Sequence, residues 1–233
     1  TTYLDNWRTT EGETQENNFL KLELLTPVVK SYPAEMSILS TSAALQCFGG
    51  YGYTKDYLAE LFFRETRIHT LHEGTTAIHG MDLLGRKVMM QNGKATMLLM
   101  QEIFADIESA KKSDKLKFYA VKLEKELGKL QETTFHLMNV AEAEGTEVFL
   151  SDAALYLELF GIITIGWQWL KQGIIVENLK QADNKKYSHE FLQSKFHALD
   201  YFYEYEMPKT GGLLRRLKSE NHVTVNTKPE EIV

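Results

Sequence analysis

Cysteine and clustered positive charge are both scarce in this sequence. The chain has 233 residues, a single cysteine (Cys47) and a formal net charge of -6. One thiol forms no disulfide within the chain and builds neither a CxxC redox pair nor a cysteine zinc site. Phosphate backbones are bound by clustered lysine and arginine, so a nucleic-acid partner is not expected. These absences favour a reducing, cytoplasmic setting.

Long apolar runs are also absent. The most apolar segment, residues 155–170, is interrupted by Glu158, Gly161 and Gly166, and a membrane span needs roughly 20 apolar residues. The N-terminal segment is polar, has no hydrophobic stretch of a signal peptide and does not begin with methionine. We therefore expect no membrane span, and we expect the chain to start inside a longer protein.

The first half of the chain has helical periodicity. Apolar residues three or four positions apart predict one buried helical face, made of Phe19, Leu22, Leu25, Val29, Tyr32 and Met36. Pro27 and Pro33 lie within this run and predict a bend or a break. A helix over 35–47 is expected to end at a glycine-rich turn. Two more helices are expected, one over 56–66 with Asp56 as N-cap and one from Thr75 or Thr76 to about Met90.

The clearest boundary is Asn92-Gly93, a strong turn signal where the composition changes. Beyond it, apolar residues at helical spacing predict helices over 95–110, 115–144, 147–182 and 188–207. Gly145 and residues 182–185 are the expected breaks. The sequence thus predicts an all-α fold, with one helical bundle over 1–92, a second helical bundle over 93–217 and a disordered tail over 218–233.

Two short clusters have residue types suited to chemistry. The first, Gln46-Cys47-Phe48-Gly49-Gly50-Tyr51-Gly52-Tyr53, has glycines that let the backbone approach a ligand closely. It is not a G-x-G-x-x-G pattern and no strand precedes it, so a plain structural turn is the more common interpretation than a phosphate site.

The second cluster is His72-Glu73-Gly74-Thr75-Thr76, in a loop that enters a helix. A carboxylate there acts either as an electrostatic cap or, held against an apolar pocket, as a base, and spacing alone favours the cap. His69, His72 and His79 are close in sequence, but Gly74 interrupts any shared helical face and no HExxH pattern exists. No metal site is expected.

Together, residues 46–53, the segment Arg64-Glu65-Thr66-Arg67-Ile68 and Glu73-Gly74-Thr75 resemble the closing signature of the acyl-CoA dehydrogenase family. The resemblance covers about residues 20–88. Residues 95–217 are similar to the C-terminal extension of one branch of that family. The resemblance implies a C-terminal portion of an FAD-dependent enzyme, without the N-terminal helical and middle β domains, and inactive in isolation.

The resemblance also implies roles for individual residues. Glu73 would remove the α proton of an acyl-CoA thioester while the β hydrogen leaves as hydride to the flavin, and Gly74 would lie beside the substrate. Such a base needs a dry pocket that raises its pKa. The implied cofactor contacts are Gln46, Cys47, Phe48, Gly49 and Gly50 to the FAD of a neighbouring subunit, and Thr75, Thr76 and Ala77 to the flavin of the same subunit.

The implied partners are an acyl-CoA, an electron-transfer flavoprotein as electron acceptor, and further copies of the chain in a dimer or tetramer. The sequence departs from common family members at His72, Ala77 and His79. These departures leave open how the chain contacts the flavin and which acyl groups it prefers. Two alternatives stand: a non-catalytic helical module for oligomerisation or docking, and a flavin-binding relative with weakened activity. Burial of Glu73 beside an apolar cleft would favour catalysis, whereas its exposure as a helix cap would favour docking.

Overall fold

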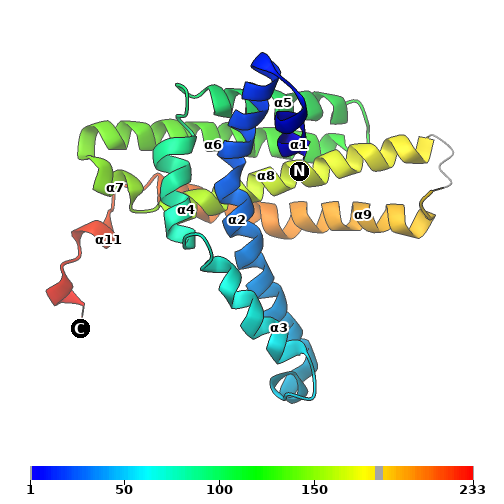
Figure 1. Cartoon of the computed structure of the whole chain (residues 1–233), viewed down its shortest axis with the longest axis horizontal. Helices are drawn as coiled ribbons and strands as arrows, with labels where there is room; N and C mark the ends of the chain where they lie inside the picture. The colour runs from blue at the N-terminus through cyan, green and yellow to red at the C-terminus, as the bar shows by residue number, and fades with distance from the viewer. Residues whose placement is uncertain (1, 182–185, 233) are drawn as a thin grey trace. The chain divides into compact units, whose positions relative to one another are not determined.

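All regular secondary structure of the described residues is helical in a computed structural model that places residues 2–181 and 186–232. No strand occurs among these residues, which confirms the all-α prediction. The chain divides into two compact units, Thr1–Thr96 and Met97–Val233 (Figure 1). The expected helix break at 182–185 lies outside the described residues.

The first unit is built on one long helix. Helix α2 (Gly12–Phe48) has 37 residues and is therefore roughly 55 Å long. It contacts α1 (Thr2–Thr9), α3 (Ala59–Thr66) and α4 (Thr76–Asp82). Pro27 and Pro33 both lie inside α2, so of the predicted bend or break, the break does not occur. Each proline removes one backbone donor, and packing of the neighbouring helices along α2 offsets that loss.

The buried face of α2 differs from the predicted one. Leu20, Leu24, Val28 and Tyr32 are buried at a spacing of four residues, whereas Val29 is 68% exposed. The predicted stripe was right at Tyr32 but wrong at Val29, because apolar residues occupy neighbouring positions along α2, and periodicity alone does not choose between two overlapping stripes. This rotation leaves the face that contains Val29 open.

The shorter elements of the first unit differ from prediction at their ends. Helix α3 begins at Ala59, so Asp56 is not its N-cap. Thr75 takes the N-cap position of α4, which ends at Asp82 and continues as the π-helical segment η3 (Leu83–Lys87). Two 3-10 segments, η1 (Gly49–Tyr53) and η2 (Arg67–Thr70), flank α3.

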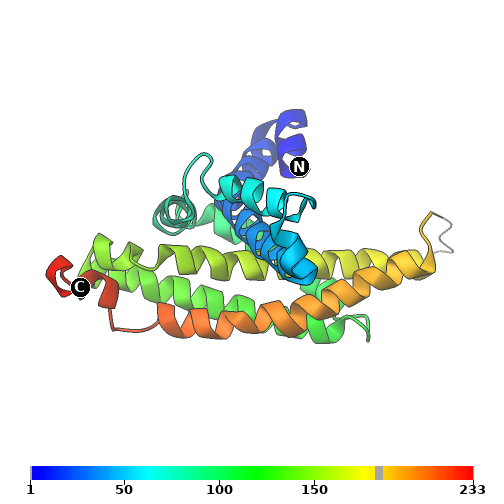
Figure 2. The same cartoon turned by 90° about the horizontal axis from the view of Figure 1, so that it is seen from below.

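The second unit is a bundle of long helices joined by short connections. A helical bundle was predicted for the residues after Asn92. Helix α8 contacts α6, α9 and α10, and Figure 2 shows α6, α8 and α9 running alongside one another. The predicted helix over 147–182 is divided in two by residues 151–152. The helices of this unit are α5 (Lys94–Ala110), α6 (Lys117–Glu144), α7 (Thr146–Leu150), α8 (Ala153–Gln181), α9 (His189–Tyr201) and α10 (Thr210–Leu217).

Helix α8 forms the core of this unit. By length and composition alone it is apolar enough to cross a membrane, but 67% of its most apolar window is buried inside the protein. Tyr156, Phe160 and Trp167 are almost fully buried, and the Trp167 indole N–H donates to Asp106 Oδ2 at 2.7 Å. Core packing therefore accounts for the apolar character of α8.

The C-terminal elements are short. Helix α9 continues into the π-helical η4 (Phe202–Glu206) and the 3-10 segment η5 (Met207–Lys209). The segment predicted to be a disordered tail carries two short helical turns, α11 (Val223–Asn226) and η6 (Pro229–Glu231), neither of which contains a buried residue. His222 Nε2 lies 3.3 Å from Glu144 Oε2.

The turn after α2 depends on Gly52. A Cβ at this position would lie 2.7 Å from the backbone oxygen of Leu45, whereas a Cβ at Gly50 would meet no atom within 4 Å. We expect Gly52→Ala to lower the free energy of unfolding by about 1–3 kcal/mol, because the backbone has to shift. Gly50→Ala is the matched control and should change it little. Equal melting temperatures for the two variants in thermal denaturation would contradict this assignment.

Candidate active site

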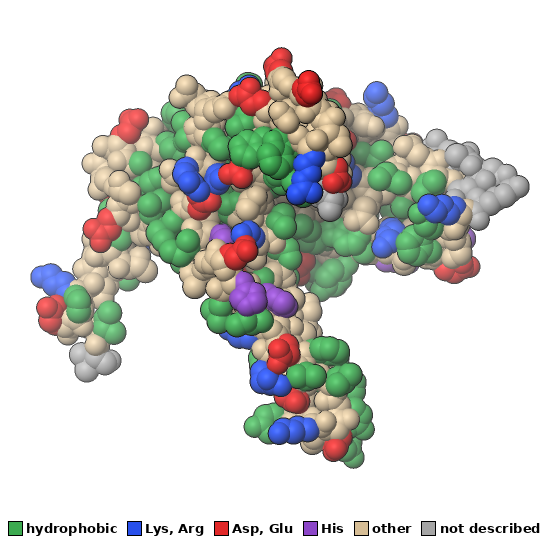
Figure 3. Space-filling view, in the orientation of Figure 1, with side chains coloured by type: hydrophobic (Ala, Val, Ile, Leu, Met, Phe, Trp, Pro, Cys, Tyr) green, Lys and Arg blue, Asp and Glu red, His purple; other side chains and the backbone are tan. Residues whose placement is uncertain are grey.

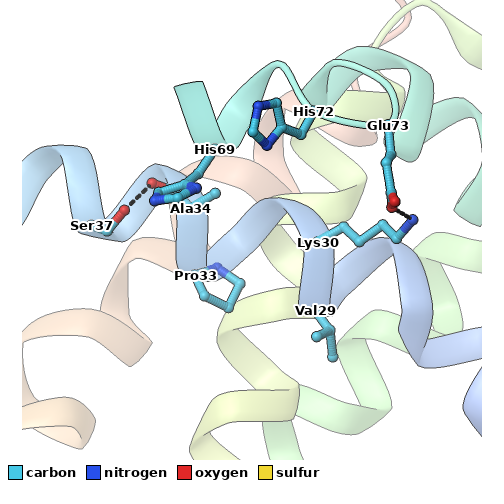
Figure 4. A pocket seen from close by; sticks show the side chains of 8 residues that line it. All are labelled: Val29, Lys30, Pro33, Ala34, Ser37, His69, His72 and Glu73. Atoms are coloured by element: carbon cyan, nitrogen blue, oxygen red, sulfur yellow. Dashed lines mark hydrogen bonds and ion pairs between the residues drawn. The ribbon is translucent and has the colours of Figure 1, made fainter. Parts of the chain in front are cut away.

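A pocket of about 620 Å³ lies along the open face of α2 (Figure 4). One wall is formed by α2 residues and the other by η2 and the turn that follows it. Because the α2 residues are three or four positions apart, they share one side of the helix. The lining residues are Val29, Lys30, Pro33, Ala34 and Ser37 from α2, with His69, His72 and Glu73 opposite.

The turn that carries Glu73 has an unusual backbone. Glu73 has φ 56° and Gly74 has φ 113°, and a side-chain-bearing residue at positive φ is uncommon and concentrates at functional sites. The Thr76 hydroxyl donates to Glu35 Oε1 on α2, which fastens the turn to the long helix. The chain therefore holds Glu73 in a defined position at the pocket rim.

The side chain of Glu73 is exposed, not buried. Its relative exposure is 71%, and it forms an ion pair with Lys30 of α2. The hydrogen bond and charge of Lys30 lower the pKa of Glu73, and the charges of His72 and His79 lower it further by smaller amounts. The dry pocket and raised pKa expected from the family resemblance are therefore not found in this chain. Because the carboxylate is largely exposed, the desolvation that raises its pKa is outweighed by the hydrogen bond and charge of Lys30.

Three histidines surround the turn. His79 is buried at 8% exposure, and its Nε2 has no hydrogen-bond partner among the described residues. The rings of His69 and His72 meet edge to face, with centroids 6.2 Å apart. Within residues 2–181 and 186–232, no group of three or more His, Cys, Asp or Glu side chains is arranged to hold a metal ion.

The other predicted cofactor residues lie at the far end of α2. Gln46, Cys47 and Phe48 complete the helix, Gly49 and Gly50 open η1, and all five are exposed. Gln46 follows Glu35, the partner of Thr76, by eleven residues, a rise of roughly 16 Å along a helix. The structure thus brings residues 73–77 to the middle of α2 and leaves residues 46–50 as a separate surface.

These two surfaces differ in which polar groups they leave open. Around Gly49 and Gly50 no protein atom fills the place of a Cβ, so their backbone is open to a polar ligand, with the exposed Gln46 amide beside it. Thr75 and Ala77 are also exposed, but the Thr76 hydroxyl already donates to Glu35. Neither surface encloses a ligand alone.

Sequence reasoning missed Lys30 and Glu35. Lys30 pairs with Glu73 and Glu35 binds Thr76, both across more than forty residues of sequence. A signal existed in the helical spacing of Lys30, Ala34 and Ser37, which places these residues on one side of α2. Nothing in that spacing shows which segment packs on that side.

The fold and the site together define a pair of helical units whose first unit presents a glutamate-bearing turn over a long helix. Residues 3–89 match the family model described as acyl-CoA dehydrogenase, C-terminal domain. Residues 99–228 match the model described as acetyl-CoA dehydrogenase C-terminal like. The second match alone spans more than half of the chain. The chain belongs to the acyl-CoA dehydrogenase family, which confirms the resemblance drawn from its motifs.

Curated relatives agree with this membership. A 3-methylmercaptopropionyl-CoA dehydrogenase of Ruegeria pomeroyi is 30% identical over 77% of this chain and 30% of its own length. A broad-specificity linear acyl-CoA dehydrogenase of Mycobacterium tuberculosis is 27% identical over 80% of this chain and 31% of its own. A butyryl-CoA dehydrogenase of Syntrophomonas wolfei is 24% identical over 96% of this chain and 36% of its own. The chain spans about a third of the length of these relatives.

Proposed function

We propose that this chain supplies the catalytic base of an FAD-dependent acyl-CoA dehydrogenase, and that Glu73 is that base. The observation that carries the proposal is the Glu73-Gly74 turn, held at positive φ at the rim of a pocket of about 620 Å³. Membership of the acyl-CoA dehydrogenase family supports the reaction class. The names of the relatives support an acyl-CoA as substrate.

In the proposed reaction, a carboxylate oxygen of Glu73 takes the proton from the α carbon of the thioester. The β hydrogen leaves with its electron pair, and a double bond forms between the α and β carbons. Bound FAD supplies the hydride acceptor. The backbone amide of Glu73 donates to the thioester carbonyl and stabilises the negative charge that develops there. Gly74 lies beside the substrate and lets it approach the backbone.

Glu73 becomes a sufficient base only when its surroundings change. A carboxylate exposed to water and paired with Lys30 has a lowered pKa, and such a group is a weak acceptor for a weakly acidic proton. An acyl-CoA in the pocket would exclude water from the carboxylate and raise its pKa by desolvation. We assign the rest of the desolvation of the Glu73 carboxylate to protein surfaces other than those of the described residues.

The family resemblance supports assembly as a homo-oligomer. By that resemblance we assign Gln46 through Gly50 to the FAD of a neighbouring subunit and Thr75 through Ala77 to the flavin of the same subunit. The two sets are separated by roughly 16 Å of α2. An electron-transfer flavoprotein is the proposed electron acceptor.

The test is anaerobic mixing of the full-length natural protein, loaded with FAD, with a panel of saturated acyl-CoAs of different length and branching. Loss of the visible flavin absorbance, with stoichiometric formation of the 2-enoyl-CoA, is expected for at least one class of acyl group. Persistent oxidised flavin with every acyl-CoA would contradict the proposed activity.

A second candidate function is protein docking without catalysis, and the exposure of Glu73 and of several apolar side chains favours it. Hydrophobic side chains gather on the end of the first unit formed by η1 and α3 (Figure 3); they include Phe48, Tyr51, Tyr53, Leu58 and Phe62. Exposed apolar patches mark interaction sites. A protein that oligomerises but retains no FAD would favour this candidate, whereas FAD retained together with oligomerisation fits the dehydrogenase.

A further inference from the structure

We propose that Lys30 is a positioning residue for Glu73: it holds the carboxylate at the rim of the pocket in the resting protein and releases it when an acyl-CoA enters. The effect of Lys30 on catalysis rests on the proposed function, in which Glu73 is the base. The ion pair itself is a property of the chain and is tested separately.

The contact joins two elements that are distant in sequence. Lys30 lies in α2, 43 residues before Glu73, and its ammonium reaches the Glu73 carboxylate across the pocket. Figure 4 shows the two side chains extended toward each other, with Pro33, Ala34 and Ser37 further along the same helix. Because the lysine comes from the helix and the glutamate from the opposite wall, the pair lies where a ligand would enter.

Other charged groups around Glu73 have different positions or partners. Glu35, also on α2, accepts a hydrogen bond from Thr76. His69 and His72 line the pocket on the side of Glu73, and His79 is buried in α4. Of these groups, Lys30 is the one that makes a direct ion pair with Glu73. Lys30 also has the largest effect on the pKa of Glu73, and it lowers it.

The ion pair with Lys30 helps to place the Glu73 carboxylate but lowers its basicity. It fixes the direction of a side chain that remains 71% exposed, and a fixed direction shortens the search for a reactive geometry. It also keeps the carboxylate ionised and weakly basic. Release of Glu73 by an entering acyl-CoA would couple the gain in basicity to the presence of substrate, so the chain would hold a strong base only when the pocket is filled.

The first test is an NMR titration of the Glu73 carboxyl carbon in the full chain, with its signal assigned by its loss in Glu73→Gln. We expect Lys30→Met to raise the pKa of Glu73, and Lys30→Arg to keep it low because the positive charge remains. Lys94→Met is the matched control, since it removes a lysine whose Nζ lies 3.6 Å from Glu16. The same Glu73 pKa in Lys30→Met and wild type would overturn the proposal. If Lys30→Met does not fold, Lys30→Gln takes its place.

The second test is the pH dependence of kcat/KM for flavin reduction in the FAD-loaded protein, because kcat/KM reports the pKa of the base before the acyl-CoA enters. The base must be ionised, so the acidic limb of the profile follows the pKa of Glu73. That limb should move to higher pH in Lys30→Met, a change that a purely structural role would not produce. An unmoved limb would overturn the role in catalysis. A shifted NMR titration without any flavin reduction in wild type would leave the ion pair established and refute the dehydrogenase assignment instead.

Discussion

Replacing Glu73 by glutamine is expected to slow flavin reduction by an acyl-CoA by a factor of about 10² to 10⁴, while FAD remains bound, because the amide has nearly the same shape but accepts no proton. The turn that presents residue 73 is held by its backbone and by the Thr76 hydrogen bond to Glu35, so the substitution should leave the pocket in place. Stopped-flow absorbance of the flavin under anaerobic conditions measures the effect.

The matched control is Glu65→Gln. Glu65 is an exposed carboxylate of the same unit, paired with Arg64 at 2.8 Å, and it does not line the pocket. Its substitution removes one negative charge without touching the proposed base, so flavin reduction should continue at the wild-type rate. Equal rates for wild type and Glu73→Gln would place the base elsewhere.

The largest expected effect on stability comes from Trp167. This side chain is 1% exposed, its N–H donates to Asp106, and the Lys171 ammonium lies 4.7 Å from the ring centroid. We expect Trp167→Ala to lower the free energy of unfolding by about 3–5 kcal/mol, because a large cavity forms and Asp106 loses its donor. Urea denaturation followed by circular dichroism measures the difference.

Trp169→Ala provides the comparison for this prediction. Trp169 lies two residues further along α8 and is only half-buried, so its removal leaves a smaller cavity and should cost less stability. Unfolding of both variants at the same urea concentration would contradict a core of the second unit centred on Trp167 of α8.

The sequence predicted the helices of the second unit well because long amphipathic segments repeat one spacing many times. The predicted 115–144 and the observed Lys117–Glu144 differ only at the first turn. In α2 the same reasoning failed on the buried face, since Leu24, Leu25, Val28 and Val29 are adjacent apolar pairs that satisfy two stripes. The two prolines were also overvalued as break signals, because their local cost is offset by contacts along α2.

The candidate site was predictable only in part. Adjacent residues in the Glu73-Gly74-Thr75 motif identified the turn, since a motif is local in sequence. The partners of that turn, Lys30 and Glu35, come from α2 and depend on how distant segments pack. The expected dry surroundings of Glu73 were not found, since its side chain is exposed and paired with Lys30; a local motif does not show which segments cover a side chain.

The most direct test of the account is the loss of deuterium from an acyl-CoA labelled at its α carbon, followed by mass spectrometry in ordinary water with the FAD-loaded protein. Glu73 as base predicts that the α label is lost at a rate that falls by about 10² or more in Glu73→Gln. Equally fast loss of the α label in both proteins would contradict the central claim that Glu73 removes the α proton.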